Sequence, residues 1–91
     1  MHTWAPKDPE EVLDYRVDWE AALQDGETIV TSQFILVEGS VTMDSDDVDG
    51  FFTVLWLSGG ELNELCLITN RITTSMGRTY DETVRLRIRR K

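Results

Sequence analysis

Apolar and polar residues alternate most clearly at the end of the chain. Side chains two apart on a β-strand point to the same face, so this pattern predicts a strand over about Tyr80–Arg90. One face of that strand is apolar and the other is basic: Val84, Leu86 and Ile88 against Arg85, Arg87 and Arg89.

Four more segments are predicted as strands, each bounded by glycine- or serine-containing breaks. Phe51–Leu57 is apolar at nearly every position, which is expected of a strand buried on both faces. Thr28–Glu38 alternates, with Val30, Ser32, Phe34 and Leu36 on one face. Val41–Met43 is a short strand, and Leu65–Thr74 leads into a hairpin turn at Ser75–Arg78.

Residues 11–23 fit two periods. A strand places Tyr15, Val17, Trp19 and Ala21 on one face, whereas a helix aligns Leu13, Val17 and Ala21. The strand pattern includes the two bulkiest residues and is favoured, with a turn following at Asp25-Gly26.

The composition supports an all-β fold. Val, Ile and Thr total 23, and 20 of them follow residue 27, against only three Ala and two Lys. Branched side chains fit a pleated sheet and lose rotamer freedom in a helix. Six to seven short strands at intervals of roughly ten residues predict a single antiparallel immunoglobulin-like β-sandwich over residues 10–91.

Residues 1–9 contain both prolines and are predicted to form an extended N-terminal arm. Trp4 within this arm either folds back onto the domain or anchors a partner, and the sequence does not choose between these alternatives. The arm has no apolar stretch typical of a secretory signal peptide, so we expect synthesis in the cytoplasm.

The length of 91 residues allows one domain and is too short for a doubly wound or barrel enzyme. The formal net charge of -8 divides unevenly: residues 1–50 hold thirteen acids and two bases (-11), and residues 51–91 hold four acids and seven bases (+3). Overall acidity disfavours binding to nucleic acid or to an anionic membrane.

Candidate chemistry is sparse. Asp44, Asp46, Asp47 and Asp49 lie in a predicted acidic loop, Asp44–Gly50, and form a weak Ca²⁺ candidate that fails the EF-hand pattern. Ser-His-Asp or Cys-His catalysis would require His2, the only histidine, and Cys66 sits in an apolar run typical of a core residue. Carboxylate pairs such as Glu10-Glu11 and Asp81-Glu82 exist, but no sequence feature makes a cleft around them. We therefore predict no catalytic residues and no cofactor.

The row formed by Arg85, Arg87 and Arg89 has two interpretations. Guanidinium groups about 6.5–7 Å apart can bind carboxylates of a partner, or they can protect an exposed edge strand from unwanted pairing. Trp4 and these three arginines are the interface candidates.

Several motifs resemble a known family. Val54–Gly60 (VLWLSGG), Thr69–Thr74 (TNRITT), Gly77–Asp81 (GRTYD) and the opening Trp4–Pro9 resemble small structural proteins of tailed bacteriophages and prophages, the phage fibre-like adaptor family. The resemblance implies an immunoglobulin-like sandwich and a non-enzymatic role in the virion, with other phage structural proteins as partners and a possible homo-oligomer.

Two functions follow as hypotheses. In the first, the chain is a virion structural or adaptor protein whose acidic N-terminal half faces the basic last strand of a neighbouring copy. In the second, it is a recognition module for a surface ligand such as a glycan, with Trp4, Tyr15 and Tyr80 stacking on sugar.

Overall fold

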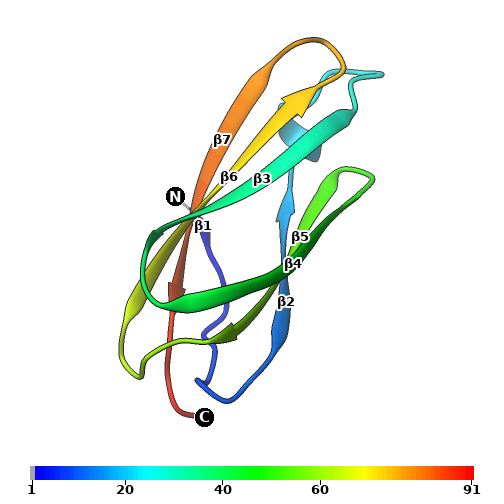
Figure 1. Ribbon diagram of the computed structural model, residues 1–91. Coiled ribbons are helices and arrows are strands. Elements are labelled where there is room, and N and C mark those ends of the chain that lie inside the picture. Colours follow the sequence, from blue (N-terminus) through cyan, green and yellow to red (C-terminus); the bar gives the residue numbers. More distant parts are fainter. Residues whose placement is uncertain (1) are drawn as a thin grey trace.

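The computed structural model describes residues 2–91, which form two facing β-sheets (Figure 1). The seven strands and one short 3₁₀ helix of this described part are β1 His2–Thr3, β2 Leu13–Asp18, η1 Glu20–Ala22, β3 Ile29–Glu38, β4 Val41–Asp49, β5 Phe52–Gly59, β6 Leu65–Thr74 and β7 Thr79–Arg87. The predicted all-β class is confirmed.

The strand order identifies the type of sandwich. One sheet has the order β1-β7-β6-β3 and the other β2-β5-β4. The second, fifth and fourth strands therefore face the third, sixth and seventh, which is the arrangement of immunoglobulin-like domains. Most neighbours are antiparallel, but β1 pairs with β7 in parallel, so the predicted purely antiparallel sandwich needs this one correction.

The core lies between the two sheets and is built from alternate residues of each strand. On β5, β6 and β7 these inward side chains have almost no exposed surface: Leu55, Leu57, Cys66, Ile68, Ile72, Val84 and Leu86. Each fully buried aliphatic side chain contributes about 1.5–3 kcal/mol relative to an exposed one. The prediction that Cys66 is a core residue is confirmed.

A buried polar group joins the two sheets inside this core. Asn70 of β6 accepts hydrogen bonds from Trp19 Nε1 (2.9 Å) and Thr53 Oγ1 (2.6 Å), both on the side of the three-stranded sheet. Its amide nitrogen donates to Ser32 Oγ (3.0 Å) and to the carbonyl of Gln33 (3.1 Å) on β3. Because a buried amide is stable only when its partners are in place, this network fixes how the sheets align.

The segment 11–23 contains a strand, as favoured, but the strand ends at Asp18. Tyr15, Val17 and Trp19 are buried as predicted. Ala21 lies in η1 and is exposed, because the chain turns into this 3₁₀ helix after Trp19.

Val30 and Phe34, predicted to share one face of β3, lie on different faces: Phe34 is buried and Val30 is not. Val30 is an extra residue in a β-bulge, since Ile29 pairs with Thr74 and Thr31 pairs with Thr73. The bulge shifts the alternation by one position, so Val30 is 62% exposed and Ile29 packs on the core instead.

The predicted acidic loop Asp44–Gly50 is wrong, because β4 runs on to Asp49 as a full partner of β5. Aspartate is depleted in strands, but β4 is an edge strand whose carboxylates project into water, and the pairing with β5 outweighs the local preference.

The burial of β5 and the end of β7 also differ from the predictions. β5 is buried on both faces only at Thr53–Leu55: on its outer face Val54 is 8% exposed, but Trp56 is 43% exposed. β7 ends at Arg87 rather than Arg90, and Ile88 instead forms an isolated parallel bridge with Lys7.

Candidate functional site: two oppositely charged sheet faces

The outer face of the three-stranded sheet carries a regular grid of side chains. Its inward residues are Tyr15, Val17, Thr53, Leu55 and Leu57, so the residues between them point outward. The register aligns three rows across β2, β5 and β4: Asp18–Phe52–Asp49, Arg16–Val54–Asp47 and Asp14–Trp56–Ser45. We call these nine residues the acidic face.

The acidic face has an apolar middle and charged sides. Phe52, Val54 and Trp56 form the central column, and the flanking columns hold four carboxylates and one guanidinium, for a net charge of -3. A half-exposed Trp is a frequent anchor of protein interfaces, where its large ring is buried by a partner.

Arg16 covers one end of that column. Its guanidinium lies 5.4 Å from the centre of the Phe52 ring and 3.6 Å from Asp49 Oδ2. Both charged side chains are at least half exposed, so the ion pair adds little stability and leaves the carboxylate available. Trp56, at the other end, stays uncovered.

A pocket with a volume of about 310 Å³ adjoins the acidic face. It opens where β2 and η1 approach β7, and its lining includes Val17, Trp19, Phe52, Arg16, Asp18 and Glu82. Three of these residues, Arg16, Asp18 and Phe52, also belong to the acidic face.

The outer face of the other sheet has the opposite charge near the C-terminal end of β7. Arg85 pairs across the ladder with Leu67, and Arg87 with Leu65, so the four side chains share one face. Both arginines are exposed and both leucines are half-buried. We call these four residues the basic face.

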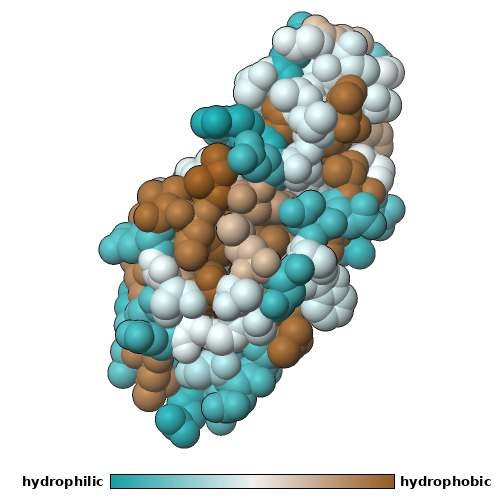
Figure 2. All heavy atoms as spheres, viewed as in Figure 1, coloured by the Kyte–Doolittle hydropathy of each residue, from teal (hydrophilic) through white to brown (hydrophobic). Residues whose placement is uncertain are grey.

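Apolar side chains continue from the basic face onto β3. Ile35 is half-buried and Val37 is 59% exposed. Figure 2 shows hydrophobic atoms gathered over the C-terminal half of β3, which is the edge strand of this sheet. The basic face is therefore one side of a mixed surface, which combines apolar side chains and the two arginines with one carboxylate, Glu38, paired with Leu67.

The arginines do not protect an open edge, because the N-terminal segment already covers the edge of β7 beside them. The amide of Trp4 donates to the carbonyl of Arg85 (2.9 Å), that of Lys7 to Arg87 (3.1 Å), and that of Arg89 to Lys7 (2.8 Å). The edge-protection interpretation fails here, since backbone groups that are already paired need no charge to guard them.

Lys7 fastens this segment to the body of the domain. Its ammonium donates to the carbonyls of Gly59 (2.6 Å) and Asp8 (2.9 Å), and the residue has no exposed surface. Burial lowers the pKa of the Lys7 amine, while the carboxylates of Glu11 and Asp8 oppose this shift. The segment from His2 to Lys7 therefore packs against the sandwich, and a turn follows at Pro9 and Glu10.

Trp4 folds back onto the domain, which settles the two alternatives left by the sequence. Its ring stacks on Tyr15 with 4.8 Å between centroids, and its Nε1 donates to the carbonyl of Arg16 (3.0 Å). Trp4 is 5% exposed and Tyr15 is 8% exposed, so neither can stack on a sugar. Burial also raises the pKa of Tyr15 to about 12.

The aspartates of the Ca²⁺ candidate do not converge. Asp47 and Asp49 lie on the acidic face, two residues apart along an extended strand. Asp44 is the extra residue of a bulge. Within residues 2–91 no three metal-ligating side chains come together.

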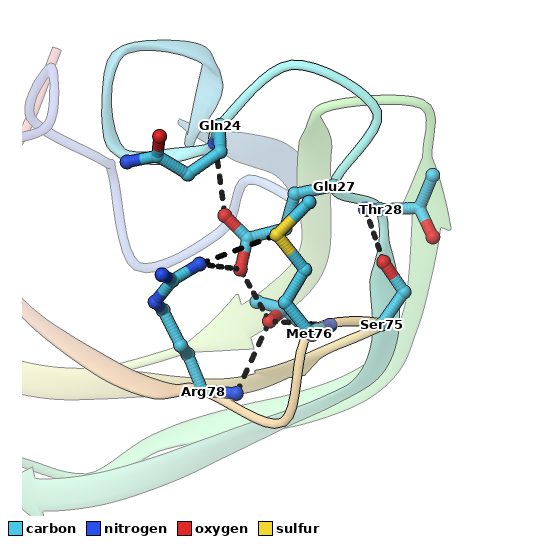
Figure 3. A network of polar contacts seen from close by, with 7 residues as sticks. Gln24, Glu27, Thr28, Ser75, Met76 and Arg78 are labelled. Carbon is cyan, nitrogen blue, oxygen red and sulfur yellow. Dashed lines mark hydrogen bonds and ion pairs between the residues drawn. The ribbon is translucent and has the colours of Figure 1, made fainter.

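A buried carboxylate, that of Glu27, holds the loop before β3 against the β6–β7 hairpin (Figure 3). Glu27 accepts hydrogen bonds from Thr74 Oγ1 (2.5 Å), the amide of Gln24 (2.9 Å) and Arg78 Nη1 (3.2 Å). The Thr74 hydroxyl, followed by the Gln24 amide, holds the pKa of Glu27 below its ordinary value.

The sequence analysis missed the acidic face. Phe52 and Trp56 were taken as buried, and the aspartates of β4 as a loop, whereas the predicted burial of Val54 is right. Arg85 and Arg87 lie exposed on the strand face predicted for them, and Arg89 is exposed just beyond the end of β7. A signal for the missed face existed in the alternation of Asp14, Arg16 and Asp18, which marks a solvent-facing column.

A family model described as podophage GP4 fiber-tail adaptor protein gp77 matches residues 7–87, which is 81 of the 91 residues. No curated protein sequence matches the chain. No helix within residues 2–91 is long and apolar enough to cross a membrane.

Proposed function

Because the chain belongs to the podophage GP4 fiber-tail adaptor protein gp77 family, we propose that it is a structural component of a phage tail that acts by binding other structural proteins. The family match shows the adaptor class. Which proteins the chain binds, and through which surface, belongs to the proposal.

The observation that carries the proposal is the acidic face. A column of Phe52, Val54 and Trp56, with Trp56 43% exposed, is flanked by four carboxylates. An apolar centre inside a charged rim is the usual anatomy of a protein interface. Two charged faces on opposite sheets also suit an adaptor, which needs one surface for each of the components it connects.

A non-enzymatic role is supported by the surroundings of Cys66 and His2, the two residues that a Cys-His catalytic arrangement would use. Cys66 has no exposed surface, and burial raises the pKa of its thiol, so the nucleophilic thiolate is disfavoured. His2 is exposed on β1, which is an edge strand of the four-stranded sheet.

We also propose that the chain is made in the bacterial cytoplasm and incorporated into the virion during assembly. The glycan-binding alternative loses two of its three aromatic candidates to the core, and no observation favours it over the adaptor role.

Deletion of the gene from the encoding phage tests this function. Purified particles would be analysed by mass spectrometry and electron microscopy, with the wild-type gene supplied in trans as the control. We expect wild-type particles to contain the chain, and deletion particles to have tails without fibres. Fibre-bearing, infectious deletion particles would refute the adaptor role.

A further inference from the structure

We propose that the acidic face of one copy binds the basic face of a second copy. The inference rests on the proposed function, because it names the occupant of a surface that the function requires. Charge is the first argument: the acidic face has a net charge of -3, and the basic face carries Arg85 and Arg87, with Glu38 of β3 in the same row as Leu67 and Arg85.

The spacing of the charges is the second argument. Asp47 and Asp49 are two residues apart on one face of β4, and Arg85 and Arg87 are two residues apart on one face of β7. Both pairs are therefore separated by about 6.5–7 Å along their strands. Guanidinium groups at this spacing match carboxylates at the same spacing, and the exposed Arg87 can form a bidentate contact.

Apolar complementarity is the third argument. Trp56 and Phe52 lie beside the carboxylates on the acidic face, and Leu65 and Leu67 lie beside the arginines on the basic face. When two sheets pack face to face at about 10 Å, such side chains interdigitate. The apolar residues supply contact area, while the ion pairs set the orientation.

The two faces are on opposite outer surfaces of the sandwich, so one copy can bind a neighbour on each side. Such a heterologous contact closes into a ring or continues as a filament, depending on the rotation between copies.

Sedimentation velocity of the purified full chain between 5 and 200 µM, as design values, tests this contact at about 50 mM and 500 mM NaCl. We expect association that weakens at least tenfold at the higher salt, because the screening length falls from above 10 Å to about 4 Å. The single variants Asp47→Arg and Arg87→Asp should each weaken association at least tenfold, and the double variant should restore it to within about threefold.

The matched control is Asp25→Arg, which makes the same charge change in an exposed turn outside both faces. Trp56→Ala is a second, uncharged variant that should also weaken association at least tenfold. Circular dichroism would verify that each variant folds.

A chain that stays monomeric at 200 µM in low salt overturns the proposal, and so does a double variant that associates no better than the single ones. Equal loss in Asp25→Arg would show nonspecific charge attraction and would also overturn it. If the chain is monomeric but particles still lose their fibres on deletion, the adaptor function stands and the occupant of the acidic face is another tail protein.

Discussion

Replacing Asn70 with Leu should destabilise the domain strongly, although the two side chains have nearly the same shape. Asn70 has no exposed surface and accepts hydrogen bonds from Thr53 Oγ1 and Trp19 Nε1. In Asn70→Leu both donors lose this acceptor, and each unsatisfied buried donor costs about 1–3 kcal/mol. Trp19 keeps a weaker contact with Thr53 Oγ1 at 3.3 Å, so the total should be about 2–4 kcal/mol.

That loss is large against a typical total stability of about 5–15 kcal/mol. It corresponds to a fall in Tm of roughly 10–25 °C for a domain of this size. Denaturant unfolding followed by circular dichroism measures the free-energy change directly, and a thermal scan measures the shift in Tm.

The double variant Thr53→Val with Asn70→Leu separates the hydrogen bonds from packing. Val has no hydroxyl to leave unsatisfied, so the double variant should cost about 1–2 kcal/mol less than the sum of the two single variants. Gln24→Ala, at an exposed position between η1 and β3, serves as the control and should change stability by less than about 0.5 kcal/mol. Strictly additive losses, or a neutral Asn70→Leu, would refute the assignment of this network as the link between the sheets.

Three further outcomes are expected. The folded-state pKa of Glu27 lies below its unfolded value, so ionised Glu27 stabilises the fold above about pH 4.5, and this stabilisation is lost as the pH falls through the folded pKa. The difference in free energy of unfolding between wild type and Glu27→Gln should therefore narrow in acid. A difference that stays constant down to about pH 2 would contradict this. Gly39→Ala should lower Tm much more than Gly77→Ala, because a Cβ at Gly39 would lie 2.5 Å from Cys66 Sγ whereas Gly77 has open space, although both have positive φ; equal shifts would argue against the close approach. Cys66 should react with a thiol reagent at least about 100-fold more slowly in the native state than in denaturant, and fast native labelling would contradict its burial.

Local patterns predicted those parts of the fold that depend on local chemistry. Leu65–Thr74 is a strand with the expected bounds, and Ser75–Arg78 is the expected turn, with Gly77 at φ 78°. The two faces of β7 were also predicted, because period-two alternation is set by the pleat of the strand itself.

The errors occurred where distant segments decide the structure. β4 continues through Asp44–Asp49 because β5 pairs with it, and that pairing is not visible in a run of aspartates. The position of Val30 depends on a bulge that only the partner strand reveals. Trp4 is buried because residues 2–9 pair with β7, some eighty residues later in the chain.

The acidic face was missed for the same reason. Its three columns come from β2, β5 and β4, so its rows exist only once the register between strands is known. Each column alone is unremarkable as a strand pattern. Together they combine an apolar centre with a carboxylate rim, which is the feature on which the proposed adaptor function depends.

Electron cryomicroscopy of the assembled tail from the encoding phage is the most direct test of the central claim, that this chain connects tail components through the acidic face. The density should place another protein chain, a second copy or a different tail component, in contact with Phe52, Val54 and Trp56. A map in which the chain is present and Trp56 faces solvent would contradict the account.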